Sequence, residues 1–112
     1  DGGFALTLGA PGGDSQLQSL LQITHNMLIF RMTPQQAIEA PRFRSSGGVS
    51  VAIEDRVKLE VLLELESLGH SLQVIPGWTS TFGGAQMIVY DPETKVLTAA
   101  ADPRREAYTL AY

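Results

Sequence analysis

Apolar and polar residues alternate at the start of the chain and then change to a helical spacing. Residues 3–8 alternate with a period of two, which predicts a strand with one face more buried. The glycine-rich stretch GAPGGDSQ follows at residues 9–16. From there to about Arg31, apolar residues recur every three or four positions, which predicts a long, mostly buried helix. Asp14 or Ser15 is placed to cap it, because either side chain can accept from free first-turn N–H groups.

A second, short helix is marked by the residues at its two ends. Thr33 stands at the N-cap position, Pro34 at the first helical position, and Gln36 where it can close a capping box. Pro41 ends this helix, because proline lacks an N–H donor and disfavours helical geometry in the residue before it.

The rest of the chain is expected to form strands around one further helix. Residues 45–48 predict a loop, and residues 55–68 a helix with apolar positions on one side and Gly69 as its left-handed terminator. Strands are expected at 49–53, 71–75, 85–90 and 95–100, the last two joined as a hairpin by DPETK. This order predicts a single α+β domain over residues 1–112, or one half of a layered sandwich.

Composition and charge narrow the classes of function. The 112 residues carry a formal net charge of -4 with scattered basic residues, which argues against nucleic acid as a partner. The absence of cysteine excludes disulfides, thiolate nucleophiles and cysteine metal sites, and leaves the compartment open. No apolar run approaches the roughly 20 residues that span a bilayer.

The stretch at residues 9–16 is the one local pattern that suggests chemistry. Its glycines allow a ligand to approach main-chain N–H groups closely, and the N-terminus of a helix leaves several such donors unpaired. A phosphate cradle is disfavoured, since the P-loop lysine is missing and Asp14 is negative. An oxyanion hole fits better, because it needs only one or two N–H donors. Local pattern alone still favours a plain turn.

No side chain elsewhere makes a convincing catalytic or metal site. His25 and His70 have no partner at a metal-ligand spacing, so both are expected to be structural, and no metal or cofactor is expected. Trp78 and Phe82 predict aromatic side chains packed under a loop rather than a pocket lining. The clustered glutamates Glu60, Glu64 and Glu66 lie on a solvated helix face, so they do not indicate an acid/base pair. No serine stands in the sequence context of a nucleophile elbow, so no catalytic triad is indicated.

Several stretches in order resemble the C-terminal part of the small catalytic subunit of the γ-glutamyltranspeptidase family. The resemblance runs across nearly the whole chain and is most specific over residues 9–43. The matching stretches are GAPGG at 9–13, LLQITHNMLIFRMTPQQAIEAPRF at 20–43, LGH at 68–70, GGAQMIVYD at 83–91 and ADPRR at 101–105.

The resemblance implies an N-terminal-nucleophile hydrolase with an αββα sandwich fold. In this family a precursor cuts itself, and a threonine becomes the first residue of the small subunit. Its hydroxyl attacks a γ-glutamyl amide, its α-amino group acts as base, and the acyl group passes to water or an amine. The family's Pro-Gly-Gly loop corresponds to Pro11, Gly12 and Gly13, so these are the expected substrate-binding residues, with the N–H groups of Gly12 and Gly13 as the oxyanion hole.

The chain departs from the family pattern in two respects. Ala10 stands where the family commonly has serine. GGDSQ resembles related amidohydrolases and cephalosporin-acylase-like members about as well as it resembles true transpeptidases. The nucleophilic threonine is expected upstream of Asp1, so these residues alone are expected to be inactive. They are expected to need the rest of the small subunit and the large subunit, or to self-associate. A non-catalytic structural module derived from the family is the alternative.

Overall fold

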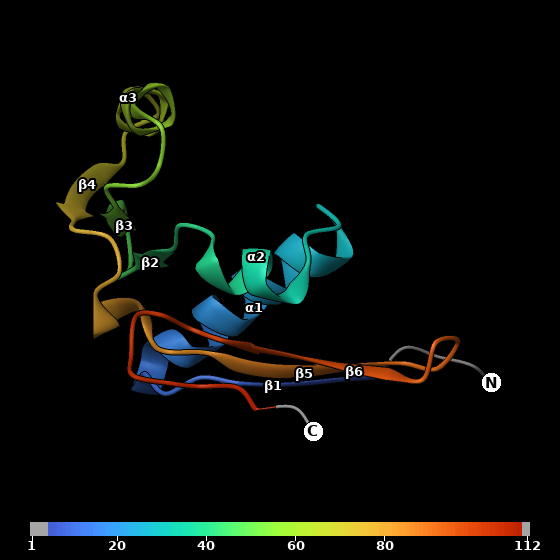
Figure 1. The fold of residues 1–112 in the computed structure, drawn as a ribbon. Helices are drawn as coiled ribbons and strands as arrows, with labels where there is room; N and C mark the ends of the chain where they lie inside the picture. Colours follow the sequence, from blue (N-terminus) through green and yellow to red (C-terminus); the bar gives the residue numbers. More distant parts are fainter. Residues whose placement is uncertain (1–4, 111–112) are drawn as a thin grey trace.

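A computed structural model describes residues 5–110 as two small sheets with three helices (Figure 1). The antiparallel sheet A has the order β1-β5-β6, and sheet B has the order β2-β3-β4 with β3 and β4 parallel. The expected α+β class is confirmed. No helix among the described residues has the length and apolar character that crossing a bilayer demands. The elements are β1 (Ala5–Gly9), α1 (Gln16–Leu28), α2 (Pro34–Glu39), β2 (Phe43–Ser45), β3 (Ser50–Glu54), α3 (Leu59–Ser67), β4 (Ser71–Ile75), β5 (Gln86–Asp91) and β6 (Val96–Ala101), with 3₁₀ turns at Gly13–Ser15 and Ser80–Phe82.

Sheet A turns one face toward α1 and α2 and the other outward (Figure 1). Leu6 lies opposite Val89 and Leu8 opposite Met87, which puts these side chains on the inner face. The predicted alternation in the first strand is therefore confirmed at residues 5–8, while residues 3 and 4 lie outside the described range. The predicted hairpin strands are also present, each displaced by one residue.

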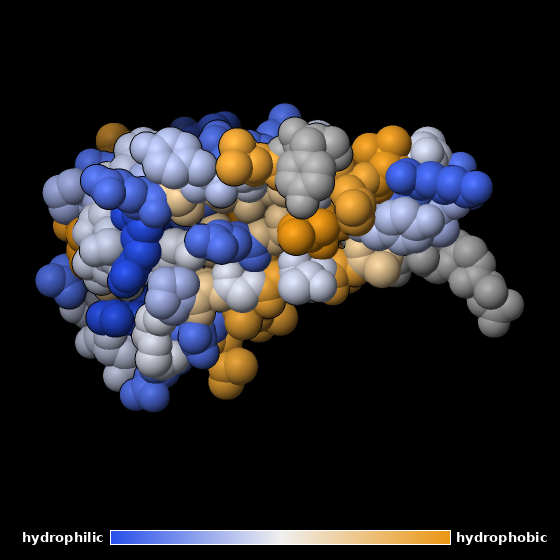
Figure 2. Space-filling view, turned by 60° about the horizontal axis from the view of Figure 1, so that its bottom comes forward, coloured by the Kyte–Doolittle hydropathy of each residue, from blue (hydrophilic) through white to orange (hydrophobic). Residues whose placement is uncertain are grey.

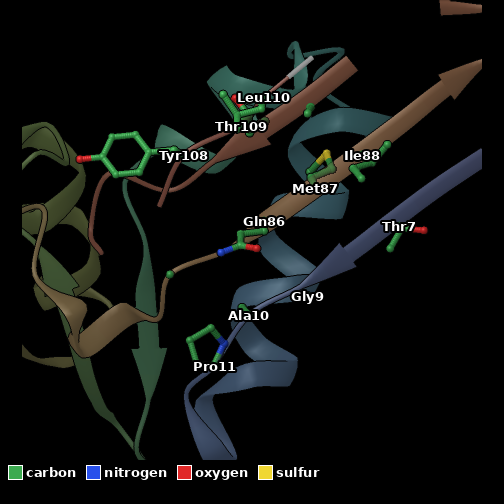
Figure 3. Close-up of a pocket in the computed structure, with 13 residues that line it drawn as sticks. Thr7, Gly9, Ala10, Pro11, Gln86, Met87, Ile88, Tyr108, Thr109 and Leu110 are labelled. Carbon is green, nitrogen blue, oxygen red and sulfur yellow. The ribbon is translucent and has the colours of Figure 1, made fainter. Parts of the chain in front are cut away.

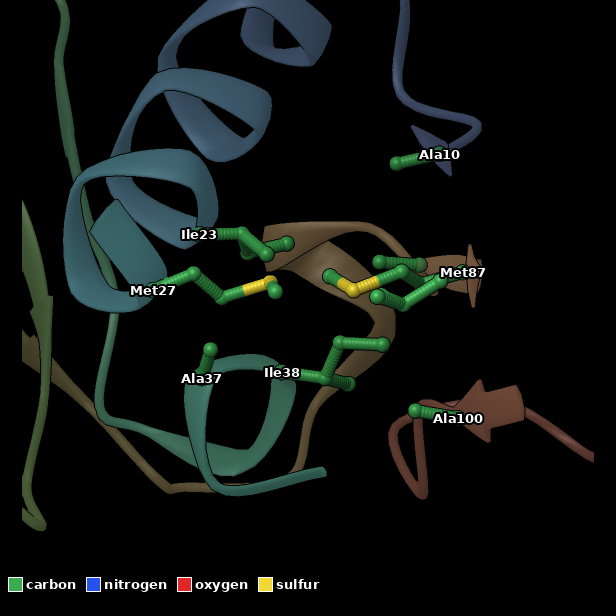
Figure 4. Packing of buried hydrophobic residues seen from close by; sticks show 9 residues of the cluster. Ala10, Ile23, Met27, Ala37, Ile38, Met87 and Ala100 are labelled. Carbon is green, nitrogen blue, oxygen red and sulfur yellow. The ribbon is translucent and has the colours of Figure 1, made fainter. Parts of the chain in front are cut away.

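The core lies between the inner face of sheet A and the two helices above it. Figure 4 shows Ile23 and Met27 of α1 pointing toward Ile38 of α2 and Met87 of β5. Ala37 and Ala100 complete the contact, and their small side chains let α2 approach the sheet closely. This cluster fixes α1 and α2 on one face of sheet A.

The prediction that the first helix is mostly buried is wrong. Only Ser19, Ile23 and Met27 of α1 are buried, whereas Leu17 is 79% and Leu21 is 69% exposed. The periodicity correctly marked a wide apolar face, but α2 and sheet A cover only one strip of it.

The ends of the first helix also differ from the prediction. Regular helix stops at Leu28, and Arg31 adopts a left-handed φ of 56°. Neither proposed cap accepts a hydrogen bond from the first turn. Instead the Ser15 hydroxyl donates to the Gly12 carbonyl at 2.7 Å. A 3₁₀ turn at Gly13–Ser15 thus replaces the expected side-chain cap.

The second helix has the predicted capping box. The Gln36 amide donates to Thr33 Oγ1, and the Thr33 amide donates to Gln36 Oε1 at 3.0 Å. Pro34 opens the helix and Glu39 ends it, two residues before Pro41. This local sequence therefore marks where α2 begins and where it ends.

Strand β2 was not predicted, and α1 covers its free edge with glutamine side chains. Gln18 exchanges two hydrogen bonds with the backbone of Ser45, at 2.8 and 3.0 Å. One turn later, Gln22 exchanges two with Phe43, at 2.9 and 3.1 Å. The two side-chain amides pair with the strand as a neighbouring strand would. They tie the start of α1 to sheet B.

Helix α3 begins later than predicted, at Leu59, and connects the parallel strands β3 and β4. Asp55, in the connection before it, accepts from the Gly77 amide at 2.8 Å. Gly69 terminates it as predicted, with φ of 95°, and the His70 amide donates to the Leu65 carbonyl at 3.1 Å. No residue of α3 is buried, since β4 is its main contact in the described chain.

Replacing Ile23 by alanine tests the position of the core. Ile23 is fully buried, so Ile23→Ala should lower the free energy of unfolding by about 2–5 kcal/mol. Glu66→Ala in α3 is the surface control and should change it by less than about 0.5 kcal/mol. Chemical denaturation measures both, and equal effects would place the core elsewhere.

Candidate functional site

The glycine turn joins the end of β1 to the start of α1. Gly12 has φ of 148° and Gly13 has φ of 55°, values that residues other than glycine rarely adopt. A Cβ on Gly12 would also lie 2.8 Å from Ser15 Oγ. The backbone angles favour glycine at both positions, and at Gly12 the Ser15 hydroxyl also leaves no room for a side chain.

The hydrogen bonds of this turn use the Gly12 carbonyl but not the N–H groups of Gly12 and Gly13 in the part of the chain that the structure describes. The Gly12 carbonyl points into the turn and accepts from the Ser15 amide at 3.1 Å and from the Ser15 hydroxyl at 2.7 Å. Within residues 5–110, the amides of Gly12 and Gly13 donate to no acceptor, and both residues are exposed. Two adjacent free donors can together hydrogen-bond one oxygen of a ligand.

Two hollows reach the turn. The first has a volume of about 530 Å³ and reaches Pro11, and the second has about 440 Å³ and reaches Gly12. The first is lined mainly by backbone and apolar groups, whereas the second is lined by Asp14, Arg44 and uncharged polar side chains. A ligand held at the turn would therefore have two neighbouring spaces of different polarity.

The first hollow lies on the outer face of sheet A. Figure 3 shows Thr7, Ile88 and Gln86 on the strands, with Tyr108 and Leu110 of the C-terminal segment across from them. Figure 2 shows apolar side chains gathered on this side of the molecule, where Ile88 is 49% exposed. Exposed apolar side chains gathered on one face are typical of a surface that another layer of protein or a ligand covers.

A loop that is distant in sequence from the glycine turn lies against the back of that turn. The Phe82 carbonyl accepts from Arg42 Nη1 at 2.8 Å and from Ser19 Oγ at 3.3 Å. Gly83, the next residue, has φ of 88° and lies so close that a Cβ would be 3.0 Å from the Pro11 carbonyl oxygen. The position of Pro11, and of the amides after it, thus depends on how residues 82–83 are held.

Those residues are held by a buried ion cluster of Arg42, Glu54, Asp102 and Arg104. Arg42 contacts Asp102 at 2.7 Å, while Arg104 contacts Asp102 at 3.0 Å and Glu54 at 2.6 Å. All four are at most 4% exposed, and Arg56 approaches Glu54 from the edge. Charges so deeply buried are tolerated only when each is paired.

The cluster also satisfies the carbonyls at the end of α2. Ile38 O accepts from Arg42 at 2.7 Å and Arg104 at 3.0 Å, and Ala40 O accepts from Arg104 at 2.9 Å. Three guanidinium groups face only two carboxylates, and the negative end of the helix offsets the excess positive charge. Asp102 in turn accepts from the Ala85 amide at 3.0 Å, which anchors the start of β5.

Arginine partners set the ionisation of Glu54. Burial alone would raise the pKa of this carboxyl, but the hydrogen bond and charge of Arg104, followed by those of Arg56, outweigh burial and hold the pKa below its ordinary value. Glu54 therefore remains a carboxylate in the interior.

Sequence reasoning assigned no role to this cluster. APRF and ADPRR were noted only as parts of the resemblance. One signal was present: Glu54 lies on the same face of its strand as Ala52, and both are buried. A charged residue on the inward face of a strand indicates an internal partner.

The aromatic and histidine predictions have mixed outcomes. Phe82 is buried as expected, but Trp78 is 43% exposed, and its ring packs on Arg56 with the guanidinium carbon 3.7 Å from the ring centre. His25 is exposed and contacts Phe30 edge to face. No group of three His, Cys, Asp or Glu in residues 5–110 is arranged to hold a metal ion.

Comparisons with known proteins place this geometry in a family. A family model described as gamma-glutamyltranspeptidase matches residues 1–112. The chain is 33% identical over 111 residues to the acylase ACY 1 proenzyme of Pseudomonas sp. (strain V22), covering 99% of this chain and 19% of the relative. It is 32% identical over 100 residues to the glutathione hydrolase proenzyme of Bacillus subtilis (strain 168), covering 89% and 16%.

Solved structures share the fold as well. Cephalosporin acylase from Bacillus halodurans matches with a TM-score of 0.88 and 32% identity, over 94% of this chain and 19% of that one. The chain thus spans about a fifth of the length of the relatives it matches.

Replacing Gly83 by alanine tests the contact behind the glycine turn. Gly69 is the control for positive φ, because its φ of 95° is close to the 88° of Gly83 but its Cβ would meet nothing within 4 Å. Alanine carries a backbone cost at both positions, and this cost is larger at Gly83, whose ψ of -159° lies in a region that is essentially restricted to glycine. Gly83→Ala should lower the free energy of unfolding by at least about 1 kcal/mol more than Gly69→Ala, because the larger backbone cost adds to the clash with Pro11. Equal losses would show that residue 83 does not press on the turn.

Replacing Glu54 by glutamine tests the ion cluster through its pH dependence. Because the folded pKa is lowered, the stabilisation by Glu54 is present above the ordinary value of 4.5 and is lost as pH falls through the folded pKa. Glu54→Gln should cost roughly 3–5 kcal/mol at neutral pH. The difference from the parent should narrow below pH 4.5, as followed by denaturant unfolding between about pH 3 and 8. Glu64→Gln, at an exposed site, is the control. A difference that stays constant with pH would contradict the ionic role.

Proposed function

Because the chain belongs to the gamma-glutamyltranspeptidase family, we propose that it forms the part of an acyl-transfer enzyme that binds the oxyanion at Gly12 and Gly13. The observation that carries this proposal is the pair of adjacent, exposed amides that donate to no acceptor within residues 5–110. Their backbone angles keep these amides beside each other, and Gly12 lines the polar hollow while Pro11 lines the apolar one. Such donors bind a developing alkoxide without needing a cation.

The reaction proposed is nucleophilic acyl transfer through an N-terminal threonine that lies outside residues 1–112. The threonine hydroxyl adds to the amide carbonyl carbon while its own amino group takes the proton, and the carbonyl oxygen becomes negative. The amides of Gly12 and Gly13 stabilise that oxygen. The carbon–nitrogen bond then breaks, the amine leaves with the proton, and the acyl group remains on the threonine until water or another amine removes it.

The supporting structure suits this role because it keeps the donors fixed before the charge develops. Pro11 is braced by Gly83, and the Gly12 carbonyl is committed to Ser15, so the peptide groups of the turn have little freedom to rotate. A preorganised donor needs no reorganisation during reaction, and one such donor is worth about 100- to 1000-fold in rate. The buried ion cluster contributes through the position of Phe82.

The substrate proposed is a γ-glutamyl amide of the glutathione type. A related acylase is the second candidate, because the acylase and the glutathione hydrolase resemble this chain to nearly the same extent. Ala10, where the family commonly has serine, also lines the first hollow and leaves it less polar there. Turnover of γ-glutamyl and simple acyl anilides by the full-length protein would separate the two candidates.

The partners proposed are the remainder of the small subunit and a large subunit. Leu17 and Leu21 on α1, and Ile88 on the outer face of sheet A, support this proposal, because packed layers of protein normally cover such surfaces. Residues 1–112 are then one domain-sized part of a larger enzyme.

Substituting proline for Gly13 in the full-length protein tests the oxyanion role. Gly13→Pro removes one N–H donor and should reduce acylation by a γ-glutamyl anilide by about 100- to 1000-fold in single-turnover assays. Gly13→Asn keeps the donor and tolerates the φ of 55°, so it should remain within a few-fold of the parent.

Gly48→Pro is the matched control for backbone strain, because Gly48 has φ of 56° and lies outside both hollows. It should retain the parent rate of acylation. Parent-like acylation by Gly13→Pro would refute the role of this amide. A full-length protein that neither cuts itself nor releases anilide would contradict the proposed enzyme.

A further inference from the structure

The polar hollow beside the glycine turn is lined by a positively charged side chain, Arg44, that the proposed oxyanion site does not use. The hollow has a volume of about 440 Å³ and is lined from the turn and α1 by Gly12, Asp14, Ser15 and Gln18, and from β2 and the loop after it by Arg44, Ser45 and Ser46. Because Gly12 belongs to its lining, a substrate whose carbonyl lies at the turn has room to place another of its groups in this space. The side chains there can select what that group is.

The backbone holds Arg44 firmly at the hollow. Arg44 pairs with Ala52 of β3, and the residues on either side of it are clamped by the glutamines of α1. The same Gln18 that fixes Ser45 also lines the hollow. The Arg44 backbone is therefore tied both to sheet B and to the helix that follows the glycine turn.

Arg44 forms no ion pair among residues 5–110, in contrast to the other partly or fully buried arginines of the described chain. Arg42, Arg56 and Arg104 each pair with Glu54 or Asp102. Within residues 5–110, no carboxylate oxygen lies within 4.0 Å of Arg44, although its side chain is half-buried. A half-buried guanidinium facing an open polar hollow is suited to bind a planar anion, above all a carboxylate.

We propose that Arg44 binds a carboxylate of the substrate whose reacting carbonyl lies at Gly12 and Gly13. This proposal rests on the proposed function and adds a specificity-determining residue to it. The carboxylate belongs either to the acyl group or to the amine that leaves or accepts, and both would present the same chemistry to the guanidinium. Ser45 and Ser46 line the same hollow and offer hydroxyl groups to the oxygens of the ligand.

Asp14 supplies a charge of opposite sign in the same hollow. Its carboxylate is exposed, so water screens its repulsion of an anionic ligand. Removing the charge of Arg44 should therefore weaken the binding of a carboxylate, and removing the charge of Asp14 should strengthen it. The effect of Arg44 should be the larger one. Opposite shifts would not follow from a general loosening of the site.

The experiment compares matched substrates with the full-length protein. One pair is a γ-glutamyl anilide and the same compound with its α-carboxylate converted to the amide. The other pair is glycylglycine and glycylglycinamide as acceptors. Arg44→Gln should reduce the preference for the free acid about 10- to 100-fold within one pair, mainly through KM, and leave kcat for the amide compound unchanged. The affected pair identifies which carboxylate Arg44 binds.

Three further variants complete the test. Arg44→Lys should keep part of the preference, Asp14→Asn should raise it about two- to threefold, and Lys58→Gln, which removes a distant exposed charge, should leave it unchanged. Equal preference for acid over amide in the parent and Arg44→Gln, with turnover intact, would overturn this inference alone. Absence of turnover in the parent would instead overturn the proposed function. In that case, calorimetric binding of the same acid and amide compounds still decides the role of Arg44.

Discussion

The pairing of buried charges constrains this structure more than any other interaction. Glu54 and Asp102 must each have an arginine partner, because an unpaired interior charge costs several kcal/mol. Glu54 belongs to sheet B, Asp102 follows the last strand of sheet A, and Arg42 follows the end of α2. Meeting the electrostatic requirement therefore brings three separate elements to one point and fixes how the two sheets meet.

The geometry of the glycine turn follows from that constraint through a short chain of contacts. Arg42 is held by Asp102 and donates to the Phe82 carbonyl. Gly83 then lies against Pro11, with room for no side chain between them. The Gly12 carbonyl turns inward to Ser15, and the N–H groups of Gly12 and Gly13 have no acceptor among residues 5–110. An interior salt-bridge cluster thus supports an exposed pair of backbone donors.

How much the sequence could predict depended on the range of the interactions involved. The capping box of α2 and the Gly69 terminator were predicted, because both are made by residues within a few positions of each other. Strand β2 was missed, since three residues carry little periodicity and the strand is completed by glutamines from a distant helix. The burial of α1 was overestimated, because an apolar face in sequence does not say what covers it.

The candidate site shows the same division between local and long-range information. The need for glycine at positions 12 and 13 was visible in the local pattern, and the family resemblance supplied its meaning. The roles of Arg44 and of the buried cluster were not visible in the local pattern, because they depend on contacts between residues far apart in the chain. Arg44 and Arg42 stand two positions apart, yet one faces a hollow and the other lies in the interior.

The central claim is that Gly12 and Gly13 bind the oxygen that becomes negative during acyl transfer. A crystal structure of the full-length protein with a tetrahedral phosphonate analogue on its nucleophile tests this claim most directly. The account predicts that one phosphonate oxygen lies about 2.7–3.1 Å from the amide nitrogens of both glycines. An oxygen bound by other donors, with both of these amides facing solvent, would contradict it.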